Sequence, residues 1–340
     1  MLALLTLFQY YKPAYQLDKG SRIKTSKEAV MLLNMGGPSN LYEIEVFLNN
    51  MFNDPYILPI KTAFLRKLAS NFIVSRRIEK SKEIYSAIGG KSPMTELTFS
   101  LIQKLNQADP TRLYTYAMRY TPPYARLVLE DIQKQGVDSI ILFSMYPQYS
   151  TTTTLSSLNE VYSLLKELNY KPTLKTIERF YQNKTFNLAV VSEIKRSIQG
   201  LDPKDFILIF SAHGLPQSVI EKGDPYQKEC EENVEILKEI IHQEGLDFEK
   251  IVLSYQSKVG PLKWIGPNTC DIVAKYRNKK IIIYPLSFTI DNSETKYELC
   301  IQYKELALKA GVKDYIVCPC LNDSQGFVET ILELVNSLKG

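Results

Sequence analysis

Short apolar runs alternate with longer amphipathic stretches along most of the chain. Apolar residues recur at helical spacing in stretches such as 155–168, 226–242 and 293–310, which predict helices. Continuous runs rich in β-branched residues predict buried strands at residues 29–34, 114–118, 139–144, 173–178, 206–211, 251–255, 280–285 and 314–318. This alternation predicts an α/β fold in which helices cover both faces of parallel sheets.

The predicted strands divide four and four, and two pairs of segments echo each other across the chain. AVMLLNMGGP and FILIFSAHGLP each indicate a buried strand that runs into a Gly and Pro turn, while SIILFSMYPQYS and KIIIYPLSFTIDNS each indicate a strand that ends in an aromatic, hydroxyl-rich loop. We therefore predict two similar doubly wound halves, 27–172 and 173–340, each with a four-stranded parallel sheet flanked by helices. Strands are farther apart in the first half, and we interpret the excess at about 51–91 as an inserted lid.

The N-terminal residues 1–26 precede the first predicted strand, and we interpret them as a loose extension. Their apolar run is short, no basic segment precedes it and no small-residue cleavage site follows, which disfavours a signal peptide. No apolar stretch of the sequence approaches the roughly 18 residues that a spanning helix needs. The five cysteines are odd in number and lack a C-x-x-C spacing, so we expect no disulfide framework and a reducing, cytoplasmic compartment.

Composition and charge exclude some partners. Hydrophobic residues make up 45% and charged residues 23% of the chain, which is typical of a globular protein with a sizeable core. The 41 Lys and Arg residues against 37 Asp and Glu residues leave a charge of +4, too small for a global field that attracts nucleic acid. GGKS at 89–92 resembles the end of a phosphate loop, but Tyr85 replaces the first glycine and Pro93 follows, so we expect no nucleotide.

One of the two histidines stands where an α/β protein places its chemistry. Ligands of open α/β sheets bind outside the carboxyl ends of the strands. His213 lies in SAHGLP, directly after a predicted strand, in a turn that Gly214 and Pro216 impose. His242 lies in the charged helix end KEIIHQEG, and we interpret it as a structural residue.

A second candidate cluster is SFTIDNSETKYEL at 287–299, which follows a strand and opens a helix. Asp291 or Ser293 can cap that helix, which puts Glu294 in its first turn and Glu298 four residues later on the same face. These acids could simply complement the helix dipole. We favour the alternative, a row of carboxylates that points toward His213.

Several segments together resemble the ferrochelatase family, bacterial type, in order and spacing over about residues 27–335. They are LLNMGGP (32–38), IGGKSPM (88–94), MRYTPPY (118–124), MYPQYS (145–150), SAHGLP (211–216), GDPY (223–226), YQSKVGPLKWIGP (255–267) and FTIDNSETKYEL (288–299). The resemblance implies two α/β halves around a porphyrin cleft. It also implies a lyase that inserts Fe2+ into protoporphyrin IX to give protohaem, the last step of haem biosynthesis, with porphyrin and ferrous iron as partners and no permanently bound cofactor.

The resemblance also implies roles for the two candidate clusters. His213 and Glu294 match the paired catalytic residues and the metal site, to which Glu298 is a weaker addition. The reaction needs such a pair, because two pyrrole N–H protons must leave as the metal enters, and imidazole and carboxylate groups accept protons.

Other matched positions are implied to contact the porphyrin. They are Met35, Tyr120, Trp264 and Phe288 as lining, with Arg119, Arg76 and Arg77 near the carboxylate side chains, where a guanidinium fork suits an anion. Plain core packing is the alternative for the apolar residues, and we favour the cleft most for Phe288 and Met35. A solvated charge run is the alternative for Arg76 and Arg77.

The lid interleaves apolar residues with Lys and Arg, which is typical of a helix that lies on an anionic membrane surface. It resembles the apolar lip of the family, and we add peripheral contact with the inner face of the membrane as a hypothesis. An ordinary packed helix is the alternative.

The chain also departs from the family pattern. Asn292 stands where a second His is common, and Cys300 and Gln302 replace acids farther along the helix. Some relatives bind a [2Fe–2S] cluster, and Cys318 and Cys320 invite that comparison. We expect no cluster, because one ligand position of those relatives is Thr151 here.

Two further functions remain open at this point. A chelatase of the same fold could use coproporphyrin or cobalt, although the lid and YQSKVGP favour protoporphyrin. A non-catalytic carrier of haem or metal could also consist of two α/β halves around a cleft.

Overall fold

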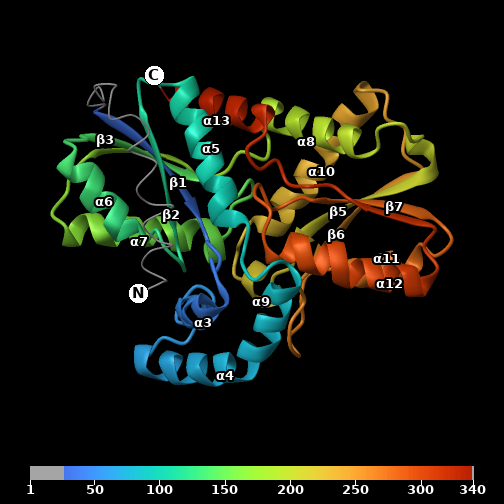
Figure 1. Cartoon of the computed structure of the whole chain (residues 1–340), viewed down its shortest axis with the longest axis horizontal. Coiled ribbons are helices and arrows are strands. Elements are labelled where there is room, and N and C mark those ends of the chain that lie inside the picture. Colours follow the sequence, from blue (N-terminus) through green and yellow to red (C-terminus); the bar gives the residue numbers. More distant parts are fainter. Residues whose placement is uncertain (1–26, 339–340) are drawn as a thin grey trace. The chain divides into compact units, whose positions relative to one another are not determined.

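The computed structural model describes residues 27–338, so the interpretation of 1–26 as a loose extension lies outside the described residues. The chain splits into two compact units (Figure 1). The first unit comprises Met1–Tyr146, Thr151–Glu178 and Ile331–Gly340, and the second comprises Pro147–Ser150 and Arg179–Thr330. The relative placement of the units is not determined, and each has its own sheet and its own core.

Each unit is built on a four-stranded sheet in which all strands are parallel. The strands of the first sheet are β1 (Glu28–Asn34), β2 (Leu113–Met118), β3 (Ser139–Ser144) and β4 (Thr173–Ile177), in the order β2-β1-β3-β4. Those of the second are β5 (Phe206–His213), β6 (Lys250–Gln256), β7 (Lys280–Pro285) and β8 (Asp314–Val317), in the order β6-β5-β7-β8. The predicted fold class is confirmed, and the two sheets share one topology.

Helices connect the strands in both units. The first unit contains α3 (Ile44–Phe52), α4 (Ala63–Ala87), α5 (Met94–Ala108), α6 (Ala125–Lys134) and α7 (Ser156–Glu167). The second contains α8 (Lys184–Ser197), α9 (Gln217–Ile220), α10 (Tyr226–Gln243), α11 (Thr269–Lys275) and α12 (Tyr303–Ala310), and the final helix α13 (Gln325–Ser337) extends across the division between units. Two short 3-10 turns are Leu41–Glu43 and Pro203–Asp205, and two π-helices are Thr151–Leu155 and Glu294–Gln302.

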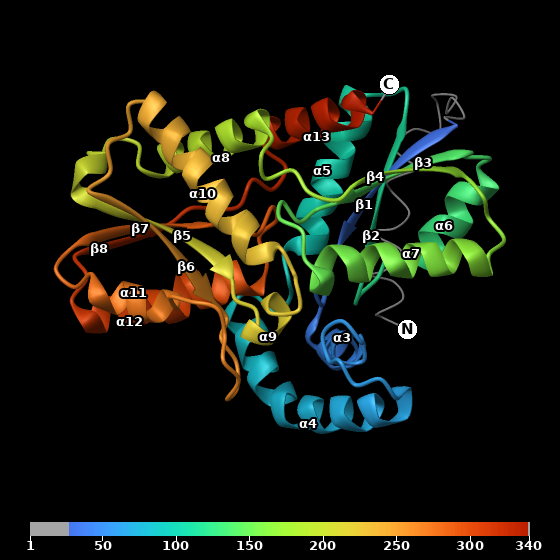
Figure 2. The ribbon, with the colours of Figure 1, turned by 180° about the vertical axis from the view of Figure 1, so that it is seen from behind.

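The sheets are apolar on both faces, which explains why the strands are continuous apolar runs rather than alternating ones. In the first unit, Ala29, Met31 and Leu33 pack against α6 and α7, while α5 lies on the other face (Figure 2). In the second unit, Ile207 and Ile209 pack against α11 and α12, and α8 and α10 cover the opposite face. Each buried Met, Leu or Ile side chain among these contributes about 1.5–3 kcal/mol by leaving water.

The join between the halves lies later than the expected boundary at 172/173. Strand β4 pairs in parallel with β3, from Ser139 opposite Thr173 to Phe143 opposite Ile177. It therefore belongs to the first sheet, and the first unit continues through Glu178. A strand is assigned by the partner it pairs with, and that partner is not visible in local sequence.

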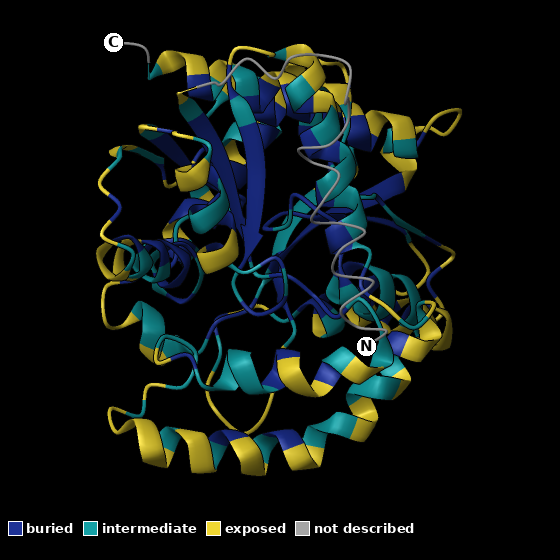
Figure 3. Ribbon diagram, turned by 60° about the vertical axis from the view of Figure 1, so that its left-hand side comes forward, coloured by how far each residue is buried: buried dark blue, intermediate teal, exposed yellow. Residues whose placement is uncertain are grey.

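The segment expected to form a lid contains the long helix α4. Its inner residues Val74 and Tyr85 share a core with Ile44, Phe47 and Leu48 of α3. The outer side of α4 is exposed (Figure 3). Among the described residues, no helix is both long and apolar enough to cross a membrane.

The register of the two sheets aligns the halves residue by residue. The N–H of Met145 donates to the carbonyl of Leu33, and the N–H of Leu286 donates in the same way to the carbonyl of Ser211. Because Leu33 and Ser211 are therefore equivalent, Met35 of the first half corresponds to His213 of the second. Only the second half has a titratable side chain at this strand end.

Candidate active site

His213 is the last residue of β5, two positions beyond the predicted end of that strand at residue 211. Its main chain is held on both sides: its N–H donates to Ser287 Oγ (2.8 Å), and its carbonyl accepts from the Tyr226 hydroxyl (2.9 Å). The next N–H, of Gly214, donates to the carbonyl of Gln256 at the end of β6 (2.8 Å). The imidazole thus projects from a backbone with little freedom.

Gly214 is required because two groups approach its α-carbon closely. A Cβ at this position would lie 2.7 Å from the carbonyl oxygen of Gln256 and 3.2 Å from the Trp264 ring. Trp264 is itself held by a hydrogen bond from its Nε1 to the carbonyl of Val259 (3.0 Å). The Gly–Pro turn therefore accommodates an indole ring directly beside His213.

Glu294 begins the π-helix that follows β7. Ser293, one of the two expected caps, occupies the N-cap position but makes no capping hydrogen bond with its side chain. The capping hydrogen bonds go instead to Asn292, whose Oδ1 accepts from the N–H groups of Glu294 (2.8 Å) and Thr295 (3.3 Å). Asp291 is buried instead in contacts with Thr295 and other neighbours. An amide at 292 thus orients the first turn, which places the Glu294 carboxylate.

The two candidate catalytic side chains face each other within the second unit. His213 Nε2 lies 3.8 Å from Glu294 Oε1, and the side chains are 33% and 25% exposed, so both reach solvent. Burial raises the pKa of Glu294; positive charge on His213 opposes this rise, and negative charge on Glu298 adds to it. The Phe288 ring stands edge-on to the imidazole, with ring centroids 6.1 Å apart. This arrangement offers two proton acceptors beside an aromatic wall.

Glu298, expected as a weaker metal ligand, has hydrogen-bond donors on both carboxylate oxygens. Oε1 accepts from the N–H of Ser257 (2.8 Å) and the Tyr303 hydroxyl (2.6 Å). Oε2 accepts from the Ser257 hydroxyl and from Gln256 Nε2 (3.3 Å). Each oxygen thus accepts two hydrogen bonds, and the role of Glu298 as a metal ligand stays a prediction.

Arg119, expected near the porphyrin carboxylates, lies in the first unit within a polar network. Its Nε donates to Ser156 (3.0 Å), its NH1 to Glu160 (2.9 Å), and its NH2 lies 3.1 Å from the fully buried Asp54. Burial raises the pKa of Glu160 to about 7, against the opposing charge of Arg119. Two carboxylates thus already compensate this guanidinium.

Tyr120 and Met35 belong to the apolar cluster of α3 and α4. Tyr120 is 3% exposed and donates to Asp54 (2.9 Å), and burial raises its pKa well above the usual value. Met35 is half-buried at the edge of the same cluster. Tyr120 therefore has the surroundings of a core residue, which was the alternative to a cleft position.

Arg76 and Arg77 lie on α4 and contact aromatic rings. The exposed Arg76 lies over the Phe72 ring at 4.4 Å from its centroid, and the half-buried Arg77 lies over Phe52 at 5.5 Å. Burial lowers the pKa of Arg77. Both guanidinium groups are stacked on rings, and within residues 27–338 neither forms an ion pair that would compete with an anion.

The structure thus brings His213, Glu294 and Phe288 together, and the Trp264 ring lies against Gly214, the residue after His213. Sequence reasoning missed Tyr226 and Ser287 as supports of His213. Tyr226 belongs to the matched segment GDPY and Ser287 opens the second cluster, so both had a signal, but neither pattern indicates a contact with His213.

The cysteines are all free, and Cys230, Cys318 and Cys320 are buried. Burial raises the pKa of Cys318 to about 12 and that of Cys320 well above its usual value. Within residues 27–338, no group of three or more His, Cys, Asp or Glu side chains is arranged to hold a metal ion. The expectation of no cluster stays a prediction.

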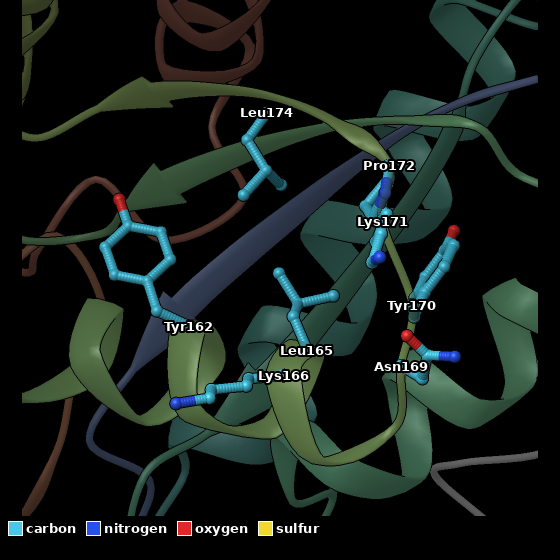
Figure 4. Close-up of a pocket in the computed structure, with 8 residues that line it drawn as sticks. All are labelled: Tyr162, Leu165, Lys166, Asn169, Tyr170, Lys171, Pro172 and Leu174. Atoms are coloured by element: carbon cyan, nitrogen blue, oxygen red, sulfur yellow. The ribbon is translucent and has the colours of Figure 1, made fainter.

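A shallow pocket of the first unit lies between the end of α7 and the start of β4, lined by residues between Tyr162 and Leu174 (Figure 4). Its charged lining residues are Lys166 and Lys171. It has neither an acid nor an imidazole, so it does not provide the chemistry found beside His213.

The fold places the chain among α/β proteins that are built from two units, each with a four-stranded parallel sheet. Its structure is similar to SirB from Bacillus subtilis, with a TM-score of 0.55 at 10% identity, over 91% of this chain and 94% of that one. It is also similar to CbiX, the terminal enzyme of siroheme biosynthesis in denitrifying bacteria, with a TM-score of 0.51 at 11% identity, over 92% and 100% of the two chains. At such low identity these likenesses show the fold alone.

The sequence then defines the family within that class. The ferrochelatase family model matches residues 27–338. The ferrochelatase of Helicobacter pylori strain J99 is 54% identical over 94% of this chain and 96% of its own, and that of Wolinella succinogenes is 50% identical over 91% and 98%. The chain belongs to the ferrochelatase family. The predicted enzyme class, a lyase of haem biosynthesis, is confirmed, and the carrier hypothesis is set aside.

Proposed function

We propose that this enzyme inserts Fe2+ into protoporphyrin IX, with His213 and Glu294 as the groups that receive the pyrrole protons. The observation that supports this most is the 3.8 Å approach of the imidazole to the carboxylate, with both side chains in contact with solvent. Each turnover consumes one Fe2+ and one porphyrin and releases protohaem and two protons. Two adjacent acceptors match that stoichiometry.

The raised pKa of Glu294 fits this role. A carboxylate destabilised by burial is a stronger base than a solvated one, and positive charge on His213 counteracts the rise. The same two groups are the proposed contacts of the incoming metal. Glu298, which the sequence offered as a weaker ligand, is not included in this proposal because four donors already occupy its two oxygens.

Apolar side chains around the pair are the proposed porphyrin contacts. Phe288 stands edge-on to His213, and Trp264 packs on Gly214. Met35 holds the equivalent strand end of the first unit. A tight apolar site could bend the macrocycle so that its nitrogen lone pairs face the metal. We keep Tyr120, which belongs to the apolar cluster that Met35 packs against, among the proposed porphyrin contacts, although it is buried.

Arginine residues are the proposed partners of the porphyrin carboxylates. Arg76 and Arg77 are stacked on rings and form no ion pair with the residues that the structure describes, so their N–H groups can donate to a carboxylate. Arg119 contacts Asp54 and Glu160, so a carboxylate would have to replace one of them or bind where Glu160 is protonated.

The test is anaerobic turnover with ferrous iron, followed by the loss of porphyrin fluorescence. Protoporphyrin and coproporphyrin are compared, with cobalt in parallel, for the unaltered enzyme and for His213→Ala and Glu294→Gln. We expect faster turnover with protoporphyrin and iron, and a loss of at least about 100-fold in both variants, the usual contribution of a proton-transfer group. Faster turnover with coproporphyrin or cobalt would reject the substrate, and full activity of both variants would reject the pair.

We further propose that α4 contacts an anionic membrane surface. Phe64, Leu65, Leu68 and Phe72 are 52–68% exposed and recur along one side of the helix, with Lys61, Lys67 and Arg76 nearby. An apolar stripe bordered by basic residues inserts shallowly between lipid headgroups.

Flotation with liposomes tests this contact. We expect the enzyme to float with anionic vesicles and to stay in solution with neutral ones, and Leu68→Glu to abolish flotation without changing turnover of soluble porphyrin. The matched control is Leu308→Glu, at a side chain of α12 that is 64% exposed and outside the stripe. Equal flotation of the enzyme and of Leu68→Glu would exclude the helix as the contact.

A further inference from the structure

We propose that Glu298 is a positioning residue: its carboxylate ties the π-helix that begins with Glu294 to the strand end beside His213, and so maintains the spacing of the pair. The inference rests on the proposed function, in which His213 and Glu294 react. It assigns Glu298 a task that differs from metal binding.

The hydrogen bonds of Glu298 carry the first step. Its two oxygens accept from four donors: the N–H and hydroxyl of Ser257, Gln256 Nε2 and the Tyr303 hydroxyl. A carboxylate has about four lone-pair sites, so these donors use all of them. A metal ion would have to displace at least one donor, whereas a positioning residue needs the donors in place.

The conformation of Ser257 carries the second step. Its φ of +64° lies in the left-handed region, which is unfavourable for a residue with a Cβ. Such a conformation persists where the surroundings hold it. Ser257 donates to Glu298 from both its main chain and its hydroxyl, so this one carboxylate stabilises the turn at the end of β6.

The third step connects this turn to His213. The carbonyl of Gln256 accepts from the N–H of Gly214, and Gln256 is the register partner of His213 in the sheet. Glu298 thus holds Gln256 from one side, and Gln256 holds the residue after His213 from the other. Glu294 lies only four residues before Glu298 on the same helix. The hydrogen bonds of Glu298 therefore constrain the positions of both His213 and Glu294.

The fluorescence of Trp264 can be used to detect whether Ser257 remains bound to Glu298. It is the only tryptophan of the chain, and it lies on the segment that leaves Ser257, with its ring against Gly214. Lys258 and Lys263, which flank the exposed part of the segment, are trypsin sites. Release of Ser257 from Glu298 should therefore change both tryptophan quenching and proteolysis.

The experiment compares Glu298→Gln and Ser257→Ala with Glu305→Gln, which removes an exposed carboxylate from the neighbouring helix. Glu298→Gln replaces one acceptor by an amide that faces donors. Ser257→Ala removes one donor and leaves the carboxylate intact, so it remains informative if Glu298→Gln does not fold. Steady-state kinetics with Fe2+ and protoporphyrin are measured together with acrylamide quenching of Trp264 and the rate of trypsin cleavage.

In both anchor variants we expect kcat to fall by at least about tenfold, the effect of losing a hydrogen bond to a charged group. The KM for Fe2+ should stay within about twofold of its original value, Trp264 should be quenched more readily, and trypsin should cut faster. Glu305→Gln should change none of these.

Two outcomes would overturn the proposal. A raised KM for Fe2+ in Glu298→Gln with unchanged quenching would make Glu298 a metal ligand. Unchanged kcat and unchanged quenching in both anchor variants would show that Glu298 does not position the pair. If the unaltered enzyme shows no turnover, the proposed function fails, and quenching and proteolysis still decide whether Glu298 anchors the segment.

Discussion

The main chain of His213 is held by two side chains that come from different elements. Tyr226 at the start of α10 donates to its carbonyl, and Ser287 after β7 accepts from its N–H. Tyr226 is buried, and burial raises its pKa well above the usual value, so it remains a donor over the working range of pH. The imidazole is therefore oriented by its neighbours as much as by its own strand.

Tyr226→Phe tests this support. Phenylalanine keeps the packing of the ring and removes the hydroxyl, so the carbonyl of His213 loses a partner and the imidazole gains freedom. We expect kcat to fall by about tenfold, and the free energy of unfolding to fall by about 1–3 kcal/mol because a carbonyl is left without its donor. Steady-state kinetics are the measurement, with Tyr42→Phe as the control because Tyr42 is 92% exposed. Unchanged kcat would show that the hydrogen bond from Tyr226 is not needed to orient His213.

Glu160 gives the enzyme a pH-dependent stability. Burial raises its pKa from 4.5 to about 7 in the folded state, so the folded protein binds this proton more tightly than the unfolded chain. The contribution of Glu160 to stability is therefore greatest below about pH 4.5 and is lost as the pH rises through about 7. The free energy of unfolding changes by an amount on the order of 3 kcal/mol over this range.

Glu160→Gln should remove this dependence. The amide does not titrate, so the variant should lose less stability than the parent between pH 5 and pH 7.5, a pH range chosen to bracket the transition at about 7. Urea unfolding at several pH values measures the difference, with Glu239→Gln on the exposed side of α10 as the control. Parallel pH profiles of the parent and Glu160→Gln would contradict the assignment.

At the scale of elements, the turn after β1 shows how close packing selects a residue. Gly36 has a φ of +82°, and a Cβ there would lie 2.2 Å from Thr121 Oγ1 and 2.8 Å from Met118 Cβ. Gly90 has a nearly equal φ of +83° with nothing within 4 Å of the added atom. The two glycines therefore share a backbone conformation and differ in their surroundings.

Alanine at each position separates backbone strain from steric overlap. Gly90→Ala should cost about 1 kcal/mol, because only the left-handed conformation is penalised. Gly36→Ala should cost about 1–3 kcal/mol more, because the turn must also move away from Thr121. Denaturant unfolding of the two variants gives the difference, and equal costs would show that the contact with Thr121 relaxes freely.

At the scale of the whole molecule, two units of the same topology have different strand ends. Met35 in the first unit and His213 in the second occupy equivalent positions, as the register of the neighbouring strands shows. The segment after the third strand of each sheet forms a π-helix, with threonines in the first unit and with Glu294 in the second. One framework thus holds a half without a titratable pair and a half with one.

His213→Met places in the second unit the residue that the first unit has at this position. Methionine is unbranched and flexible, so we expect a folded protein with a near-normal unfolding midpoint. Turnover should fall by at least about 100-fold, because the thioether does not accept a proton. Thermal unfolding and anaerobic turnover are the measurements, and retained turnover would remove the imidazole from the reaction.

The sequence by itself determined the strands, the class of fold and the family. Continuous apolar runs mark strands buried on both faces, and all eight predicted strands are present within the described residues, with ends shifted by at most two positions. Motif order identified the family, because a series of short segments at consistent spacing is improbable by chance. These properties depend on residues that are close together in the sequence, so they can be recognised without knowledge of the tertiary structure.

Only the tertiary structure decided which side chains meet. It assigned β4 to the first sheet, because strand pairing joins residues that are far apart in sequence. It also gave Arg119 two carboxylate partners and Glu298 four donors. The hydrogen-bond and ion-pair partners of an acid or a guanidinium group cannot be identified from the sequence, because they come from other elements of the fold. Whether such a group binds substrate or supports a neighbour depends on the donors and acceptors that the fold brings to it.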